Sequence, residues 1–457
     1  MSKTATKISP PMRKLAAYIA AARSAALPAA VAEKTKHHLL DTLAAIVSGS
    51  RLPPGGKAIA YAKTLGGPAE SSVIGSRLLL GATNAALANG MSAHADETDD
   101  SHAASLTHPG CGVVPAALAM AERERAGGGA LLRAVALGYD VCARLSLSLG
   151  AYAFRNAGHS THSFGPMFGA AAAAGSIARL DADRARYLLS YTAQQASGVS
   201  CWARDPHHIE KSFDFGGMPA RNGVASATMV AAGFTGVEDV FSGERNFFFA
   251  FAGNANPREL TRALGRTYEI MHTNIKRWSV GSPIQAPLDS LEALIRAHRP
   301  RADDVAKLVV RVSHHGANTV NDRDMPDICM QHMVAVMLLD GTVTFDSSHD
   351  EKRMRDPRVL ALRKRIELHG DDALQKAMPS RQGIIEITLR DGRRLRHHTR
   401  AVKGTSDNPM TRDEVEHKCF HLLAPVLGKA RAQKLIDTVW RIERVKDVRA
   451  LRPLLRA

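Results

Sequence analysis

The sequence predicts a mainly α-helical protein in which a smaller α+β unit is inserted into a large all-α domain. Three observations lead to this prediction. Apolar residues follow a helical period from the N-terminus to about residue 270, and no stretch there alternates with a period of two. Strand-like runs occur only after Asn274. Helical character returns after about residue 402. We therefore expect the all-α domain at 1–273 and 402–457, and the α+β unit at 274–401.

The first helices are recognised by the residues that start and stop them. Pro28 favours the first turn of a helix that Gly49 ends. The run at 1–30 contains basic residues and alanines, as targeting peptides do. However, Arg23 interrupts it, and no apolar stretch of about 18 residues occurs in the chain. We therefore interpret this run as the first helix of the fold.

Two later stretches, 113–122 and 165–179, are rich in alanine and glycine. Small residues let backbones approach closely, so both are predicted as buried helices in a crowded bundle. At the far end of the chain, Thr411 could cap a helix together with Glu414. The C-terminal residues are then expected to pack back on the all-α domain.

The strand signals are confined to the α+β unit. Residues 308–312 and 384–389 are rich in β-branched and apolar side chains. The second run leads through Arg-Asp-Gly into 394–399, which predicts a hairpin. Helices are predicted around 286–297 and 330–339.

Composition limits the classes of function. The chain is 45% hydrophobic and 23% charged, which is typical of a globular protein. Its five scattered cysteines form no CxxC pair, and this favours reduced thiols in the cytoplasm. The net charge of +16 is spread along the chain, and aromatic residues make up only 5%, which argues against a nucleic-acid partner. Two interpretations of this charge remain. A diffuse positive field would attract a small polycarboxylate, or the charge mainly affects the solubility of the protein.

The stretch with the most reactive groups is 94–102, followed by His108. It contains four carboxylates within five residues, between two histidines. Crowded carboxylates raise one another's pKa, so that one can act as an acid and another as a base. Pro109 disfavours helical backbone at His108, which suits a side chain that projects into a cleft. A solvent-facing loop and a metal site are the alternatives. No HExxH or similar motif is present, so we predict no metal.

These residues and others along the chain resemble the MmgE/PrpD family, whose members act on polycarboxylic acids as dehydratases, decarboxylases and epimerases. The family pattern A-H-x-x-D-F-D-D-T-H, then H-P-S and P-A-x-L-A-x-A-E, is matched at 93–102, 108–110 and 115–122. Further matches, in family order, are at 41–44, 158–170, 211–213, 220–223, 276–278, 331–332 and 338–342. The resemblance implies an all-α domain with an α+β lid, and a homodimer.

The resemblance also implies the roles of the site residues. It places Glu97 at the family's catalytic aspartate, Ser101 at its threonine and Asp99 at a later acid. His108 and His159 are then the proton-transfer groups, and His159 would lie at a helix N-terminus capped by Ser160 or Thr161. We interpret His162 as the exposed neighbour of His159.

The anion-binding residues follow from the same matches. Lys211 and Lys276 are expected to form a carboxylate clamp, each contributing about 1.5–3 kcal/mol. His332 replaces a tyrosine of the decarboxylase branch and is expected to bind substrate. The pocket departs from the family pattern at Gly281 and at Asp214, where the family has histidines.

We therefore expect a cytoplasmic hydro-lyase without metal or other cofactor, acting on a small hydroxylated di- or tricarboxylate. The acidic loop, two imidazoles and two lysines would meet around one hollow between the helical body and its lid. Loss of the histidine at Gly281 makes an isomerase or epimerase the alternative, and a decarboxylase is a third. Two alternatives belong to other classes of function: a nucleic-acid-binding module and a metal-dependent hydrolase. No membrane partner is expected.

Overall fold

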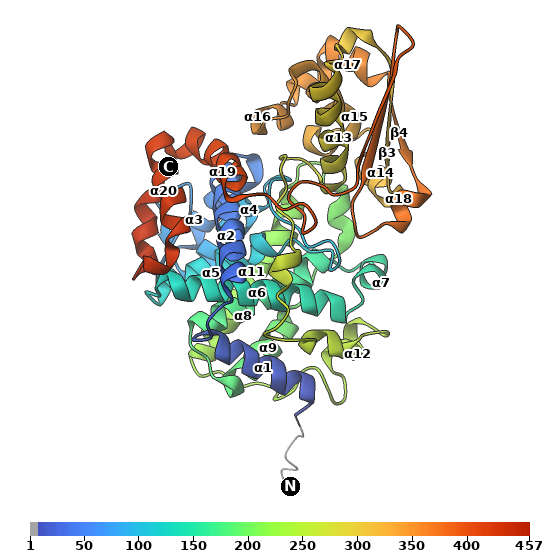
Figure 1. Cartoon of the computed structure of the whole chain (residues 1–457). Coiled ribbons are helices and arrows are strands. Elements are labelled where there is room, and N and C mark those ends of the chain that lie inside the picture. Colours follow the sequence, from blue (N-terminus) through green and yellow to red (C-terminus); the bar gives the residue numbers. More distant parts are fainter. Residues whose placement is uncertain (1–7) are drawn as a thin grey trace. The chain divides into compact units, whose positions relative to one another are not determined.

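The computed structural model describes residues 8–457 and divides into two compact units (Figure 1). The first unit comprises residues 8–95, 99–273 and 412–457. The second comprises Asp96–Thr98 and Asn274–Thr411. The sequence predicted domain limits at residues 273 and 401, and these limits remain predictions.

The first unit is built almost entirely of helices, and the protein is mainly α-helical, as predicted. Its helices are α1 (Pro10–Ala22), α2 (Ala29–Gly49), α3 (Pro53–Leu65), α4 (Ala82–Ala93), α5 (Pro109–Arg123), α6 (Gly128–Ser148), α7 (Ala151–Asn156), α8 (Thr161–Ile177), α9 (Ala182–Gln195), α10 (Ile209–Ser212), α11 (Met218–Ala231), α12 (Phe247–Phe251), α19 (Arg412–Leu427) and α20 (Lys429–Trp440). The start of α2 after Pro28 and its end at Gly49 agree with the sequence prediction.

Helix α8 forms the centre of this unit, and every one of its residues is buried. It packs against α5, α6 and α11 (Figure 1). A Cβ on Gly169 would lie 2.4 Å from the carbonyl oxygen of Gly138 in α6. The backbones of α6 and α8 are therefore in direct contact, which confirms the reason given for the small residues in this stretch.

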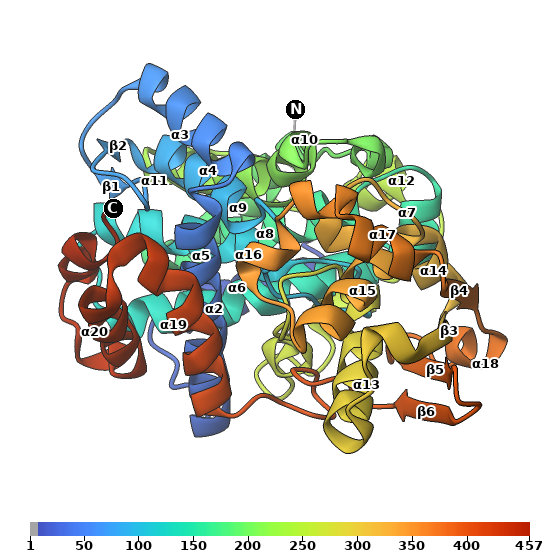
Figure 2. The same cartoon turned by 90° about the horizontal axis from the view of Figure 1, so that it is seen from above.

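The C-terminal helix α19 lies along α2 within the same unit (Figure 2). A buried ion pair joins them, with Lys418 Nζ 2.5 Å from Asp41 Oδ1. Burial raises the pKa of Asp41 to about 6, although Lys418 opposes this shift. The first unit also contains two short antiparallel strands, β1 (Ser71–Ser72) and β2 (Leu79–Leu80), which the sequence analysis did not predict.

The second unit contains a four-stranded sheet of order β4-β3-β5-β6. Its strands are β3 (Val305–Val312), β4 (Ile366–Gly370), β5 (Gly383–Leu389) and β6 (Arg394–Thr399), and its helices are α13 (Ser282–His298), α14 (His314–Val320), α15 (Met330–Asp340), α16 (Phe345–Ser348), α17 (Pro357–Arg363) and α18 (Asp372–Lys376). The predicted hairpin is present as β5 and β6. Helix α13 packs against these two strands, and α15 packs against α13.

Strand β4, which pairs in parallel with β3, was missed from the sequence. Only Ile366 of its five residues is buried, because β4 is an edge strand. An edge strand with one buried side chain has almost no apolar signal.

In the part of the chain that the structure describes, no helix combines the length and the apolar character that crossing a membrane requires. All five cysteines are free thiols.

Candidate active site

Asp99 connects two histidines in the first unit. His94 directly follows the end of α4, and His108 directly precedes α5 with a non-helical backbone, as Pro109 predicts. Nδ1 of His94 donates to Asp99 Oδ2 at 2.9 Å, and Nδ1 of His108 donates to Asp99 Oδ1 at 3.0 Å. All three side chains are buried. One carboxylate therefore orients both imidazole rings.

This arrangement fixes which ring nitrogen is basic. An ionised carboxylate only accepts hydrogen bonds, so the proton of each neutral imidazole lies on Nδ1. The lone pair is then on Nε2, the atom farther from Asp99. Two bases with a common orienting carboxylate suit proton transfer to and from a bound molecule.

Phe215 lies between two imidazole rings of this group. Its ring stacks on His94 with 4.3 Å between centroids and on His162 with 4.0 Å. The ring of His162 is also 5.2 Å from that of His108. The interpretation of His162 as an exposed neighbour is therefore wrong, because its side chain is buried beside His108. Burial, and then the nearby His108 and Arg155, hold the pKa of His162 well below its usual value.

Phe215 is placed here by a distorted stretch of helix. Residues Phe213–Gly217 form one π-helical turn, a feature that is frequent at functional sites. A Cβ on Gly216 would lie 2.0 Å from the carbonyl oxygen of Gly90 in α4. The two backbones can meet because both residues are glycines, and this contact brings Phe215 to the end of α4 beside His94.

Lys211 adds a positive charge to this group. Its Nζ lies 5.3 Å from the centroid of Phe215 and 5.7 Å from that of Trp202. Cations are attracted to aromatic faces at these distances. Lys211 is thus held over rings that also contact His162, consistent with a cation that binds an anion beside the imidazoles.

Asp214 is connected to the ring of Trp202 through the hydroxyl of Ser160. Ser160 donates to Asp214, and Trp202 Nε1 donates to Ser160 Oγ at 3.2 Å. Burial raises the pKa of Asp214 to about 7, against the opposing effect of the hydrogen bond from Ser160. A carboxyl group that titrates near neutrality therefore lies two hydrogen bonds from the ring that faces Lys211.

Asp100 has a structural role, although it directly follows Asp99. It accepts hydrogen bonds from Nδ1 of His38 at 2.7 Å, from the hydroxyl of Tyr139 at 2.5 Å and from the backbone N–H of Gly110 at 3.0 Å. These partners lie on α2, α6 and α5. Asp100 thus joins three helices around the acidic loop.

The other two acids of the loop belong to the second unit. Asp96 Oδ2 lies 3.1 Å from Nε2 of His349, and Glu97 Oε2 lies 3.1 Å from Nζ of Lys276. Each of the four crowded carboxylates therefore has its own partners. From the sequence, crowding was expected to raise the pKa values of these carboxylates, whereas in the structure each acid interacts with separate cations or hydrogen-bond donors.

The remaining predicted residues lie in different surroundings. The ring of His159 stacks on Phe154 at 4.4 Å between centroids and contacts Phe251. Ser160 is the residue before α8, but its side chain does not cap the helix. Ser101 is buried in the first unit.

His332 is fully buried on α15 in the second unit, and neither ring nitrogen has a hydrogen-bond partner among the described residues. Burial, and then the charge of Arg363, lower its pKa to about 4. The structure thus contains a neutral, unpartnered imidazole at this predicted position.

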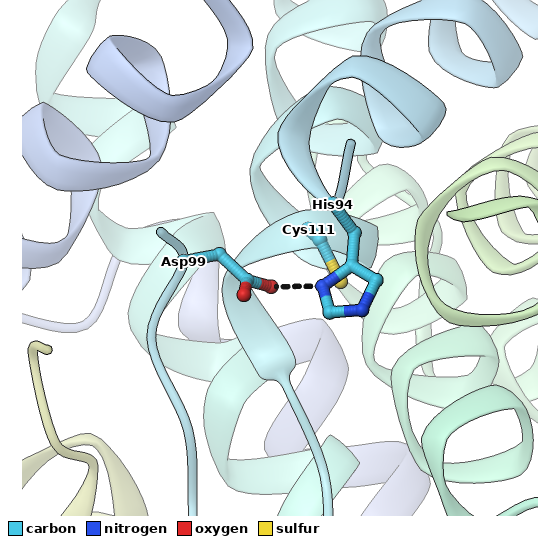
Figure 3. A group of neighbouring side chains, drawn as sticks. All are labelled: His94, Asp99 and Cys111. Carbon is cyan, nitrogen blue, oxygen red and sulfur yellow. Dashed lines mark hydrogen bonds and ion pairs between the residues drawn. The ribbon is translucent and has the colours of Figure 1, made fainter. Parts of the chain in front are cut away.

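Within the first unit, one group of described side chains has a metal-ligand composition, namely His94, Asp99 and Cys111, whose ligand atoms lie within 4.8 Å of one another (Figure 3). However, the thiol of Cys111 donates to the carbonyl oxygens of His108 and Phe215. Burial, and then Asp99, raise the pKa of this thiol well above its usual value. Metals bind the thiolate, and both oxygens of Asp99 already accept from imidazoles. The donor set therefore fits a metal poorly.

The roles of three side chains were missed from the sequence: those of His162 and Phe215 in the first unit, and that of His349 in the second. The signal available for Phe215 was its position four residues after Lys211, one helical turn away. For His349 there was no signal, because its partner Asp96 is distant in the sequence.

Two models of one protein family match successive parts of the chain. The model of the MmgE/PrpD N-terminal domain matches residues 13–260, and that of the MmgE/PrpD C-terminal domain matches residues 278–443. The cis-aconitate decarboxylase-like protein oryM of Aspergillus oryzae is 25% identical over 94% of both chains. The cis-aconitate decarboxylase of Homo sapiens is 26% identical over 93% of this chain and 90% of its own. The 2-methylcitrate dehydratase of Cupriavidus necator is 28% identical over 40% of each chain. The chain thus belongs to the MmgE/PrpD family.

Proposed function

We propose that this protein is a metal-independent lyase that removes water from a small hydroxylated di- or tricarboxylate. The observation that carries the proposal is the carboxylate of Asp99, which orients the imidazoles of His94 and His108. The named relatives include a cis-aconitate decarboxylase and a 2-methylcitrate dehydratase, which supports a lyase that acts on a polycarboxylate.

The reaction begins with proton abstraction by His108. Its Nε2 takes a proton from the carbon next to a substrate carboxylate, and the electron pair moves onto that carboxylate as an enediolate-like state. Asp99 stabilises the imidazolium that forms. The electron pair then returns to make a carbon–carbon double bond while the carbon–oxygen bond of the neighbouring hydroxyl breaks. A second histidine, which enters the reaction as an imidazolium with a proton on each ring nitrogen, gives one proton to the departing hydroxide, so that water is released and this ring becomes neutral.

Two histidines are candidates for that proton donor. His94 shares Asp99 with His108, with 5.0 Å between the two ring centroids, and its Nε2 is buried without a hydrogen-bond partner among the described residues. His159 is the candidate from the family match. Replacing each by glutamine distinguishes them, because only loss of the true donor stops water release while carbon-bound hydrogen still exchanges with solvent.

The substrate's carboxylates require cations. Lys211 is our first candidate, because aromatic rings that contact the imidazole group hold its ammonium. Lys276 is the second, and a substrate carboxylate would compete with Glu97 for it. Cations at a developing enediolate lower the barrier, since they stabilise charge that exists only in the transition state. Substrate binding by Ser101 and His332, a homodimer and a cytoplasmic location are parts of the same proposal.

A decarboxylase is the second candidate. The observation in its favour is the length of two alignments: those with the cis-aconitate decarboxylase of Homo sapiens and with the cis-aconitate decarboxylase-like protein oryM each cover more than 90% of this chain. In that reaction the bond to a carboxyl carbon breaks instead, carbon dioxide leaves, and an imidazolium returns a proton to the carbon. An epimerase, which returns the proton to the opposite face, remains the third.

A screen of small acids tests the proposal. The purified protein is incubated with citrate-like, malate-like and aconitate-like acids, and the products are identified by proton NMR. We expect an unsaturated acid formed by loss of water, and no product with His108→Ala. Release of carbon dioxide would instead support the decarboxylase. A folded wild-type protein that leaves every acid unchanged would contradict all three.

A further inference from the structure

His349 lies between two acceptors in the second unit. It directly follows α16, and its Nδ1 donates to the backbone carbonyl oxygen of Phe345 at 2.7 Å. Its Nε2 lies 3.1 Å from Asp96 Oδ2. A carbonyl oxygen has no proton to give, so the first contact requires a proton on Nδ1. The ion pair with Asp96 favours a second proton on Nε2, and the ring is then an imidazolium.

The charged groups around His349 stabilise that form. Both acids that face it, Asp96 and Asp327, are buried. The hydroxyl of Ser348 lies 3.3 Å from Nδ1 and carries no charge. Burial alone would lower the pKa of His349, but the adjacent carboxylate of Asp96 and the charge of Asp327 raise the pKa to about 9. The imidazolium therefore persists at neutral pH.

The partner of His349 belongs to a tight turn at Asp96–Thr98. Asp96 accepts from the hydroxyl of Thr98 at 2.5 Å and from its backbone N–H at 3.1 Å. The residue between them is Glu97, whose carboxylate is paired with Lys276. Two cations of the second unit thus bind two successive acids of one turn. Freeing Asp96 would release the backbone on which Glu97 is carried.

We propose that His349 is a positioning residue, which as an imidazolium holds the Asp96–Thr98 turn and thereby the carboxylate of Glu97. The expected effect of His349 on turnover rests on the proposed function, in which Glu97 is an acid of the active site. The expected effect of His349 on the Asp96–Thr98 turn does not rest on the proposed function. His349 lies outside the sequence motifs on which the resemblance to the family was based.

The direction of the pH effect follows from the sign of the pKa shift. The pKa of His349 is raised in the folded state, from 6.5 to about 9. Its stabilising contribution is therefore complete below about pH 6.5 and is lost as the pH rises through about 9. Above that pH, the neutral ring presents a lone pair to the carboxylate of Asp96, and the turn loses its ion pair.

The first test needs no substrate. Imidazole signals of the full-length protein are followed by NMR between pH 5 and 10, and the His349 signal is assigned by its absence in His349→Gln. We expect a midpoint near pH 9 that returns toward 6.5 in Asp96→Asn. The control is His369→Gln, which removes an exposed histidine that also pairs with an acid, Glu367. A wild-type midpoint at or below 6.5 would overturn the proposal.

The second test measures turnover of any acid that the wild type converts. In His349→Gln the side chain keeps a polar N–H group near Asp96 but carries no charge. We expect kcat at pH 7.5 to fall about tenfold with little change in KM, and an alkaline loss of activity near pH 9 to disappear. His369→Gln should behave as the wild type. An unchanged kcat and pH profile in His349→Gln would refute the positioning role. If the wild type converts no acid, the proposed function fails, and the NMR midpoint still decides the state of His349.

Discussion

Asp99 accepts a hydrogen bond from Nδ1 of His108 at 3.0 Å, with both side chains buried. This contact turns a cluster of acids and imidazoles into an oriented base, because it determines the tautomer of the ring. It also distinguishes Asp99 from its neighbour Asp100, whose carboxylate holds three helices together. Adjacent residues of the same type thus have a proposed chemical and a structural role.

Replacement of Asp99 tests the orienting role. In Asp99→Asn, the side chain can still accept from one imidazole, but its amide donates to the other and reverses that tautomer. We expect kcat to fall by about 100-fold or more, the size of a lost general base. The control, Asp413→Asn, removes an exposed carboxylate of the same unit and should leave kcat unchanged. A kcat within threefold of the wild type in Asp99→Asn would show that the carboxylate is not needed.

Lys211 is predicted to bind a substrate carboxylate. Lys211→Gln removes the charge that lies over Trp202 and Phe215, so KM should rise about tenfold to 100-fold, corresponding to one lost charge-assisted hydrogen bond. Lys211→Arg should recover part of this affinity, and the exposed Lys63→Gln should have no effect. Steady-state kinetics at low salt measure these values. Equal KM values for Lys211→Gln and the wild type would exclude the role.

Asp214 makes stability depend on pH in a defined direction. Its folded pKa is raised from 3.8 to about 7, so its contribution to stability is complete below about pH 4 and is lost as the pH rises through 7. Asp214→Asn cannot ionise. Relative to the wild type, its free energy of unfolding should therefore increase between pH 5 and 8, by a few kcal/mol at most. Urea unfolding at the two pH values measures this difference, and a difference that is constant with pH would contradict the shifted pKa.

Removal of metal is predicted to have no effect. Exhaustive treatment with a chelator should leave turnover unchanged, and Cys111→Ala should reduce it less than about tenfold, because only weak hydrogen bonds of the thiol are lost. Metal analysis of the purified protein provides the control. Loss of activity on chelation, restored by one divalent metal, would mean that His94, Asp99 and Cys111 do form a metal site.

Much of the fold could be predicted from the sequence because its signals are local. Pro28 and Gly49 bound a helix, and the Arg-Asp-Gly turn joins two strands of regular pattern. Strand β4 could not be predicted, since an edge strand with one buried residue lacks periodicity. The backbone effect of Pro109 on His108 was also local, and the structure confirms it.

The site was predicted less completely, because its contacts join residues that are far apart in the sequence. Nothing near His162 shows that it stacks on Phe215, and this is why it was taken for an exposed residue. The partners of Asp99 and Asp100 come from α2 and α6, from the residue after α4 and from the start of α5, whereas those of Asp96 and Glu97 come from the second unit. Sequence spacing shows that acids are crowded, but it does not show which cation neutralises each one.

The most direct test of the central claim is the exchange of carbon-bound hydrogen with solvent. An acid that the wild type converts is incubated in deuterated water, and the hydrogen next to its carboxylate is followed by proton NMR. We predict that the wild type replaces this hydrogen with deuterium or removes it in the product, and that Asp99→Asn and His108→Ala do so at least about 100-fold more slowly. Equally fast exchange in both variants would mean that these residues do not form the base.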